Sequence, residues 1–212
     1  MSSTKRVSSR RARAKAKILD ATRAVVLRDG IPAFTVEAVA ELAKVSKPSV
    51  YYYFDSKDAL IRELVLQLAA TEQAVMLEAV RAGGTGPDLL RGFVRAYVEH
   101  HLASLDLFKV QYLWSQVMGF AEGEGDAEVN AGMVQLFGAM EARLASEQQA
   151  GRLRAELHPR RLAVASWMAA QGVVHTLALL HSGGTTLTHD AMGMVDELAT
   201  ALTVGAFVDA ER

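Results

Sequence analysis

The sequence of 212 residues contains no cysteine. This absence excludes a disulfide framework, a thiolate metal site and a cysteine nucleophile. No apolar run reaches the length needed to cross a membrane, and the basic N-terminus lacks the apolar core of a signal peptide. Together these absences predict a soluble cytoplasmic protein that has no membrane partner.

Positive charge is concentrated at one end of the chain. Residues 1–62 hold 13 Lys and Arg against 6 Asp and Glu, whereas residues 63–212 hold 10 against 18. The net charge of −1 hides this division. A polyanion-binding surface is therefore expected only in the N-terminal third. Residues 1–10 lack apolar periodicity and are predicted to form a disordered basic arm, which can reach phosphates or the minor groove beside a DNA-binding module.

No segment alternates with period two for long enough to form a strand, so the predicted fold is all-α, with about nine helices. Besides two short helices, helices are expected at about residues 11–28, 57–81, 88–104, 106–120, 128–150, 159–181 and 188–208. The glycine-rich stretch at residues 83–87 lacks the preceding strand and following Lys-Ser/Thr of a phosphate loop, so it is interpreted as a linker. The acidic run at residues 122–128 lacks the ligand spacing of a calcium loop and is interpreted as solvated.

Two short helices joined by a tight turn are predicted between residues 35 and 54. Thr35 and Ser46 can each cap a helix, because a hydroxyl accepts a backbone N–H that is otherwise unpaired at a helix start. Pro48 suits the first turn of the second helix, where its missing N–H costs little. This arrangement is a helix-turn-helix, whose second helix can lie in the DNA major groove.

The second short helix carries three adjacent tyrosines, Tyr51, Tyr52 and Tyr53. Successive side chains of a helix are about 100° apart, so the three rings cannot all face one core. Val50 and Phe54, four residues apart, are the expected inward pair, and Tyr51 and Tyr52 are expected to project outward. The competing interpretation is an aromatic-rich core helix, but three adjacent tyrosines suit a core badly.

The segment VSKPSVYYYFDSKDAL at residues 45–60 resembles the recognition helix and following segment of the TetR family of bacterial transcriptional regulators. The resemblance extends over residues 12–65, and one departure is Lys44, where the family usually has glycine. It implies a three-helix DNA-binding domain at residues 11–56. It further implies a helical effector-binding and dimerisation domain at residues 57–212.

The predicted DNA contacts gather at the second short helix. Lys47, Pro48 and Ser49 occupy its N-terminus, the end that meets base edges in this motif. The resemblance implies phosphate contacts from residues around them. These are Thr35, Tyr51, Tyr52 and Lys57, and Ser46 and Tyr53 complete the predicted DNA-binding set.

Aromatic, methionine and polar residues are interleaved in the C-terminal two thirds of the chain. Most are expected to be core, but a buried polar group needs a partner, and a mainly apolar cavity with a few polar groups describes a small-molecule pocket. The predicted ligand-binding residues are Tyr97, His101, Phe108, Tyr112, Trp114, Met118, Phe137, Trp167, Gln171 and His175. Acyl thioesters, antibiotics and bile-acid-like molecules all stay open as effectors.

The last two expected helices are rich in small and methyl-bearing residues, too many for one internal stripe. The resemblance implies that they form a four-helix interface with a second copy. The whole pattern predicts a homodimeric, ligand-responsive repressor, released from a palindromic double-stranded DNA operator by a small effector, with no metal or other cofactor. An architectural DNA-binding protein and a small helical enzyme are the alternatives, and the enzyme lacks His-Glu-x-x-His, Gly-x-Ser-x-Gly and dinucleotide glycine patterns.

Overall fold

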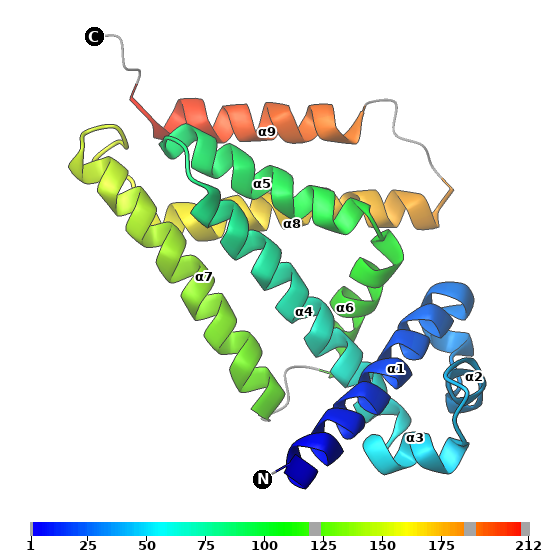
Figure 1. Cartoon of the computed structure of the whole chain (residues 1–212). Helices are drawn as coiled ribbons and strands as arrows, with labels where there is room; N and C mark the ends of the chain where they lie inside the picture. Colours follow the sequence, from blue (N-terminus) through cyan, green and yellow to red (C-terminus); the bar gives the residue numbers. More distant parts are fainter. Residues whose placement is uncertain (1, 119–123, 185–189, 209–212) are drawn as a thin grey trace. The chain divides into compact units, whose positions relative to one another are not determined.

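The computed structural model of the chain describes residues 2–118, 124–184 and 190–208. Within these ranges the chain forms nine helices and no strand, so the predicted all-α fold is confirmed (Figure 1). The helices are α1 (Ser2–Ala33), α2 (Val36–Leu42), α3 (Lys47–Tyr53), α4 (Lys57–Ala82), α5 (Gly86–Leu102), α6 (Leu105–Met118), α7 (Glu124–Gln149), α8 (Pro159–Ser182) and α9 (Ala191–Ala206). Their order is the expected one.

The contacts of the chain divide it into two compact units. Unit 1 comprises Met1–Leu68 and Val110–Gly119, and unit 2 comprises Ala69–Lys109 and Phe120–Arg212. The division within α4 therefore falls at Leu68, later than the expected domain end at residue 56. The reason is that Leu60 and Leu64, in the first turns of α4, are fully buried in the core of unit 1.

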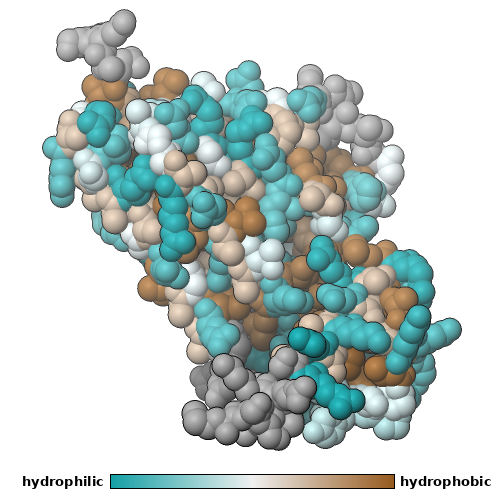
Figure 2. Space-filling view, viewed as in Figure 1, coloured by the Kyte–Doolittle hydropathy of each residue, from teal (hydrophilic) through white to brown (hydrophobic). Residues whose placement is uncertain are grey.

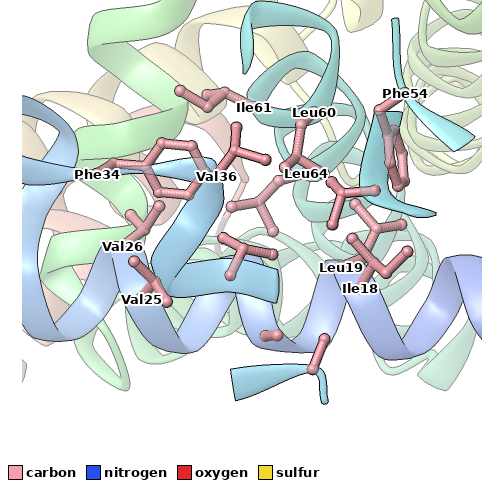
Figure 3. Close-up of a cluster of buried hydrophobic side chains, with 14 of the residues drawn as sticks. Ile18, Leu19, Val25, Val26, Phe34, Val36, Phe54, Leu60, Ile61 and Leu64 are labelled. Atoms are coloured by element: carbon pink, nitrogen blue, oxygen red, sulfur yellow. The ribbon is translucent and has the colours of Figure 1, made fainter. Parts of the chain in front are cut away.

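The core of unit 1 collects apolar side chains from α1, α2, α3 and the start of α4. Figure 3 shows Phe34 beside Val26 and Val36, and Phe54 close to Leu60. Phe34 is only 1% exposed, as expected for the residue that fills the centre of a small helical domain. Burial of so many branched and aromatic side chains holds the short helices α2 and α3, which are too short to be stable alone.

The first helix begins earlier than predicted. It begins at Ser2, so the segment expected to be a disordered arm is helical from Ser2 onward, with neither glycine nor proline before Gly30 to interrupt the helix. Gly30 has φ 75° and ψ 168°, a conformation that breaks the helix and that glycine adopts without steric cost. The helix is therefore interrupted close to its expected end at about residue 28, and residues 31–33 add a short helical turn after Gly30.

In unit 2, α5 packs against both α8 and α9, and α7 packs along α8 (Figure 1). The start of α7 also corrects a prediction. The acidic run at residues 122–128 was expected to be a loop, but residues 124–128 are already helical. Residues 122 and 123 of this run lie outside the part of the chain that the structure describes.

One corner of unit 2 is held together around Gly86, the first residue of α5. The Glu147 carboxylate accepts the backbone N–H of Gly86 at 3.1 Å and two N–H groups of Arg152 at 2.8 Å each. A Cβ added to Gly86 would lie 2.1 Å from the Phe207 ring, so only glycine fits there. Phe207 in turn pairs with Leu153 as an isolated antiparallel bridge.

Candidate nucleic-acid interface

The helix-turn-helix of unit 1 begins with two capped helices. The Thr35 hydroxyl accepts the backbone N–H of Ala38 at 3.2 Å, and the Ser46 hydroxyl accepts that of Ser49 at 3.2 Å. Pro48 lies in the first turn of α3. Both predicted caps are therefore confirmed, and each satisfies one of the N–H groups that a helix start leaves unpaired.

The turn between the two helices depends on Lys44. Its φ of 52° is left-handed, and it is the only non-glycine residue of the described chain with a positive φ. The Lys44 N–H donates to Glu41 O at 3.0 Å and the Val45 N–H donates to Ala40 O at 2.9 Å, which is the Schellman pattern of a helix end. A glycine, which the resembled family usually has at this position, would adopt this conformation freely, whereas a lysine adopts it with strain.

The three tyrosines of α3 do not share one environment. Val50 and Phe54 are buried at 1% and 4% exposure, whereas Tyr51 and Tyr52 are exposed at 41% and 68%. The predicted inward pair and the outward tyrosines are confirmed. Tyr53 is half-buried against the core of unit 1, with its ring edge-on to the Tyr52 ring at 5.0 Å between centroids, so it stabilises the orientation of α3.

Cationic side chains lie over the exposed rings of α3. The Lys47 Nζ lies 6.0 Å from the ring centre of Tyr51, and the Arg11 guanidinium carbon lies 5.7 Å from that of Tyr52. Cations at this distance are attracted to the ring face. Arg11 belongs to α1 and brings a further positive charge close to α3. It is not part of the DNA-binding set that the helix-turn-helix motif predicts.

Two more lysines lie over buried rings of unit 1. Lys57 lies 5.4 Å from the ring centre of Phe34, and Lys15 lies 5.6 Å from that of Phe54. Lys15 also pairs with Glu63 at 2.6 Å.

Figure 2 shows hydrophilic side chains projecting from this unit, at the lower right of the view. Arg11 and Lys15 belong to the basic run that precedes Asp20, the first acidic residue of the sequence, and they are four residues apart on one helix.

The N-terminus of α3 is tied to α2 by an ion pair between Lys47 and Glu37. The hydrogen bond from Lys47 lowers the pKa of the Glu37 carboxyl, and the same bond raises the pKa of Lys47. Both groups are exposed. Beside them, the hydroxyls of Ser46 and Ser49 lie 2.7 Å apart, so the predicted base-reading hydroxyl of Ser49 already has one hydrogen-bond partner.

The predicted ligand-binding residues fall in both units. The described members in unit 2 are Tyr97, His101, Phe108, Phe137, Trp167, Gln171 and His175, and Tyr112 belongs to unit 1. The side chains of Trp114 and Met118 lie outside the described residues. Within unit 2 the described residues form two groups.

The first group surrounds His101, which is 4% exposed. The ring centres of Tyr97, His100 and Phe108 lie 4.6, 4.9 and 5.0 Å from that of His101. Its Nε2 is 3.4 Å from an oxygen of Glu72, yet this buried nitrogen makes no hydrogen bond within the described structure. Burial, with a smaller effect from the Glu72 charge, raises the pKa of the Tyr97 phenol well above its usual range. Glu72 was not among the predicted ligand-binding residues. Its sequence signal is that it follows Leu68 by four residues, on the apolar face of the same helix.

The second group lies on α7 and α8. The rings of Phe137 and Trp167 meet edge-on at 5.8 Å between centroids, and the Arg160 guanidinium lies 5.3 Å from the Phe137 ring centre. The Trp167 Nε1 is buried and, among the described residues, makes no hydrogen bond. Gln171 and His175 are half-buried on the following turns of α8. No three His, Asp or Glu residues of the described ranges are grouped as a metal site would require.

The helices α8 and α9 each present an exposed stripe of small and apolar residues. On α8 these are Ala165, Met168, Gly172, Thr176 and Leu179, and on and after α9 they are Ala201, Val204, Gly205 and Val208. Met168, Leu179 and Val204 are at least 60% exposed. A Cβ added to Gly172 or Gly205 would meet nothing within 4 Å, so packing inside the chain does not require glycine there. By length and composition alone, α8 could also span a membrane.

Residues 18–64 match the sequence model of the family described as bacterial regulatory proteins, tetR family. This range contains most of α1, all of α2 and α3 and the first turns of α4. No curated protein matches the chain.

Solved structures resemble nearly the whole chain. A TetR family transcription regulator from Marinobacter aquaeolei VT8 has a TM-score of 0.66 at 16% identity, over 94% of this chain and 98% of that one. The transcriptional regulator FadR from Bacillus subtilis, in complex with stearoyl-CoA, has a TM-score of 0.69 at 17% identity, over 90% and 98%. The ketosteroid transcriptional regulator KstR2 of Mycobacterium tuberculosis has a TM-score of 0.61 at 18% identity, over 92% and 95%. At these identities the likeness concerns the fold.

Proposed function

We propose that this chain, which belongs to the tetR family of bacterial regulatory proteins through residues 18–64, is a DNA-binding transcriptional regulator that responds to a small effector. The observation that carries the proposal is the exposure of Tyr51 and Tyr52 beside Arg11 and Lys47. Exposed phenols can donate to phosphate oxygens, and adjacent cations release counterions when they bind a polyanion.

In the proposed DNA complex, the N-terminus of α3 enters the major groove. Lys47, Pro48 and Ser49 then meet base edges, because they occupy the first turn of that helix. The other residues of the set hold the phosphate backbone and fix the register of the protein on the duplex. We assign this role to Thr35, Ser46, Tyr51, Tyr52, Tyr53 and Lys57, and add Arg11.

We propose that a second copy of the chain covers the exposed stripes of α8 and α9. Small residues such as Gly172 and Gly205 let a facing helix approach closely, and the apolar side chains between them gain by leaving water. The other sides of α8 pack on α5 and α7, so only its exposed stripe needs a partner. A single facing helix covers such a stripe, whereas a bilayer would surround the whole helix. A homodimer would present two copies of α3 to a palindrome, with half-sites about one DNA turn, roughly 34 Å, apart. Its place of action would be the cytoplasm.

The effector of the proposed regulator is a small molecule with a largely apolar body. Two buried nitrogens of unit 2 without hydrogen bonds in the described structure, His101 Nε2 and Trp167 Nε1, support a ligand that supplies polar partners among aromatic rings. The similar regulator FadR, in complex with stearoyl-CoA, supports the same kind of effector. An effector that prefers a dimer with wrongly spaced α3 helices would release the operator, so the regulator acts as a repressor. It binds its effector and does not transform it.

Selection of random double-stranded DNA by the purified full-length chain tests this function. We expect one palindromic sequence to be enriched, and Tyr52→Ala to weaken its binding severalfold at constant salt. The same selection in the presence of candidate lipophilic effectors should lose the enrichment when the correct effector is present. A protein that enriches no sequence, while its circular dichroism shows a folded helical chain, would contradict the proposed DNA-binding role.

A further inference from the structure

An exposed carboxylate lies where the proposed DNA-binding surface should be cationic. Glu37 lies in the first turn of α2 and pairs with Lys47, the first residue of α3. Their side chains remain 62% and 48% exposed. A carboxylate at this place repels phosphates and removes one charge from the counterion release that drives non-specific binding. A surface made only for affinity would therefore not carry it.

Stability does not account for the pair either. Exposed ion pairs contribute little to folding, because water screens them and two flexible side chains must be ordered. The α2–α3 arrangement is already held by buried residues such as Val39 and Val50 and by the turn around Lys44. The pair therefore requires an explanation on the surface itself.

The chemistry of the pair matches one feature of duplex DNA. Lys47 Nζ and the Glu37 carboxylate place a donor and an acceptor side by side at the first residue of α3. In the major groove a G·C pair presents the guanine acceptors N7 and O6 next to the cytosine N4 donor. Lysine is a preferred partner of the former, and glutamate accepts from the latter. A donor and an acceptor that lie side by side therefore suit the two bases of one such pair.

We propose that Glu37 is a specificity-determining residue, which accepts a hydrogen bond from the amino group of a cytosine while Lys47 donates to the paired guanine. This inference rests on the proposed DNA-binding function. The hydrogen bond between Lys47 and Glu37 that shifts their two pKa values in opposite directions keeps both groups charged at neutral pH. Where the G·C contacts are not made, the negative charge of Glu37 still offsets the positive charge of Lys47. Lys47 then adds little attraction to phosphates, so other DNA sequences bind weakly.

The test compares DNA selections for the wild-type chain, Glu37→Gln and Glu41→Gln. Glu41 is the matched control, since it is an exposed glutamate on the same helix that forms no ion pair with Lys47. We expect the wild type to enrich G·C at one position of each half-site. Glu37→Gln should lower the preference for that base pair severalfold, because a neutral amide oxygen accepts a hydrogen bond more weakly than a carboxylate and no longer pairs with Lys47. Glu41→Gln should leave the preference unchanged.

Salt titrations on non-specific DNA supply a second readout. Freeing Lys47 should steepen the salt dependence of Glu37→Gln by about one unit of slope, and non-specific affinity should rise. An identical base preference in the wild type and Glu37→Gln would overturn the inference while leaving the DNA-binding function intact. The inference would also be overturned if the preference that Glu37→Gln loses were for an A·T pair and not for a G·C pair. If the wild type enriches no sequence at all, the proposed function itself fails.

Discussion

The carboxylate of Glu147 accepts the backbone N–H of Gly86 at 3.1 Å and so joins the end of α7 to the start of α5. The hydrogen bond from Arg152 is the main cause that lowers the pKa of Glu147, and the Gly86 N–H adds to it. We expect Glu147→Gln to lower the free energy of unfolding by about 1–2 kcal/mol at neutral pH, since charge-assisted hydrogen bonds become neutral ones.

The pH dependence of this effect has a definite sign. A carboxyl whose pKa is lower in the folded state than in the unfolded state stabilises the fold above its ordinary pKa of 4.5, and this stability is lost as the pH falls through the folded value. The difference between wild type and Glu147→Gln should therefore shrink in acid. Urea unfolding between pH 7 and pH 3 measures it. Exposed Glu156→Gln is the control, and a constant difference across the range would contradict the assignment.

Lys44 occupies a left-handed conformation that costs a side-chain-bearing residue energy. Lys44→Gly should raise the free energy of unfolding of unit 1 by about 1 kcal/mol, and Lys44→Asn, which tolerates the same φ, should also stabilise. Lys44→Gln removes the charge without relieving the backbone and is the control. Thermal unfolding of the three variants measures the effect. Stabilisation by glutamine equal to that by glycine would show that charge, and not φ, is responsible.

Much of unit 1 could be predicted from the sequence because its signals are local. Caps at Thr35 and Ser46 act within three residues, and the outward orientation of Tyr51 and Tyr52 follows from helical geometry around Val50. The left-handed turn was also predictable, since Lys44 replaces a glycine in an otherwise matching motif. Each of these inferences needed only the spacing of nearby residues.

The contacts that sequence reasoning missed join residues far apart in the chain. Arg11 reaches Tyr52, and Glu72 lies beside His101, through packing that no local pattern encodes. The helical start of α1 was missed for a different reason. Its polar, charged composition resembles that of a disordered tail. Composition alone does not predict that a helix formed by later residues extends back to Ser2.

Lys57 permits a test of phosphate binding that leaves packing in place. Its Nζ lies 5.4 Å from the centre of the buried Phe34 ring, so Lys57→Met keeps an apolar chain of similar length there and removes the charge together with its cation–π contact. We expect weaker binding to all DNA sequences and a salt slope smaller by about one unit, with little change in thermal stability. Fluorescence anisotropy across a salt series gives the slope. An unchanged slope would contradict a phosphate contact from Lys57.

The buried pair of His101 and Glu72 is a test of the effector region. His101→Phe removes the imidazole whose Nε2 lies 3.4 Å from the buried Glu72 carboxyl, which should cost about 1–3 kcal/mol. Adding Glu72→Leu should restore most of that loss, because two apolar groups replace two polar ones. Chemical unfolding measures the cycle, and additive losses in the double variant would contradict coupling between the two side chains. If this pair contacts the effector, the stable double variant should no longer show the effector-induced rise in Tm.

The exposed stripe of α9 predicts the oligomeric state. Val204 is 70% exposed, and in a homodimer through α8 and α9 its side chain would be buried against the second copy. Val204→Glu would then place an unpaired charge in an apolar interface, a change that costs far more than the same charge in water. We expect the wild type to have twice the 22.9 kDa mass of one chain in light scattering, and Val204→Glu to have the mass of one.

Val134→Glu is the matched control, since Val134 is 66% exposed but lies on α7. Dissociation by both variants would indicate an interface on α7, and a dimer that survives Val204→Glu would exclude this part of α9 from the contact.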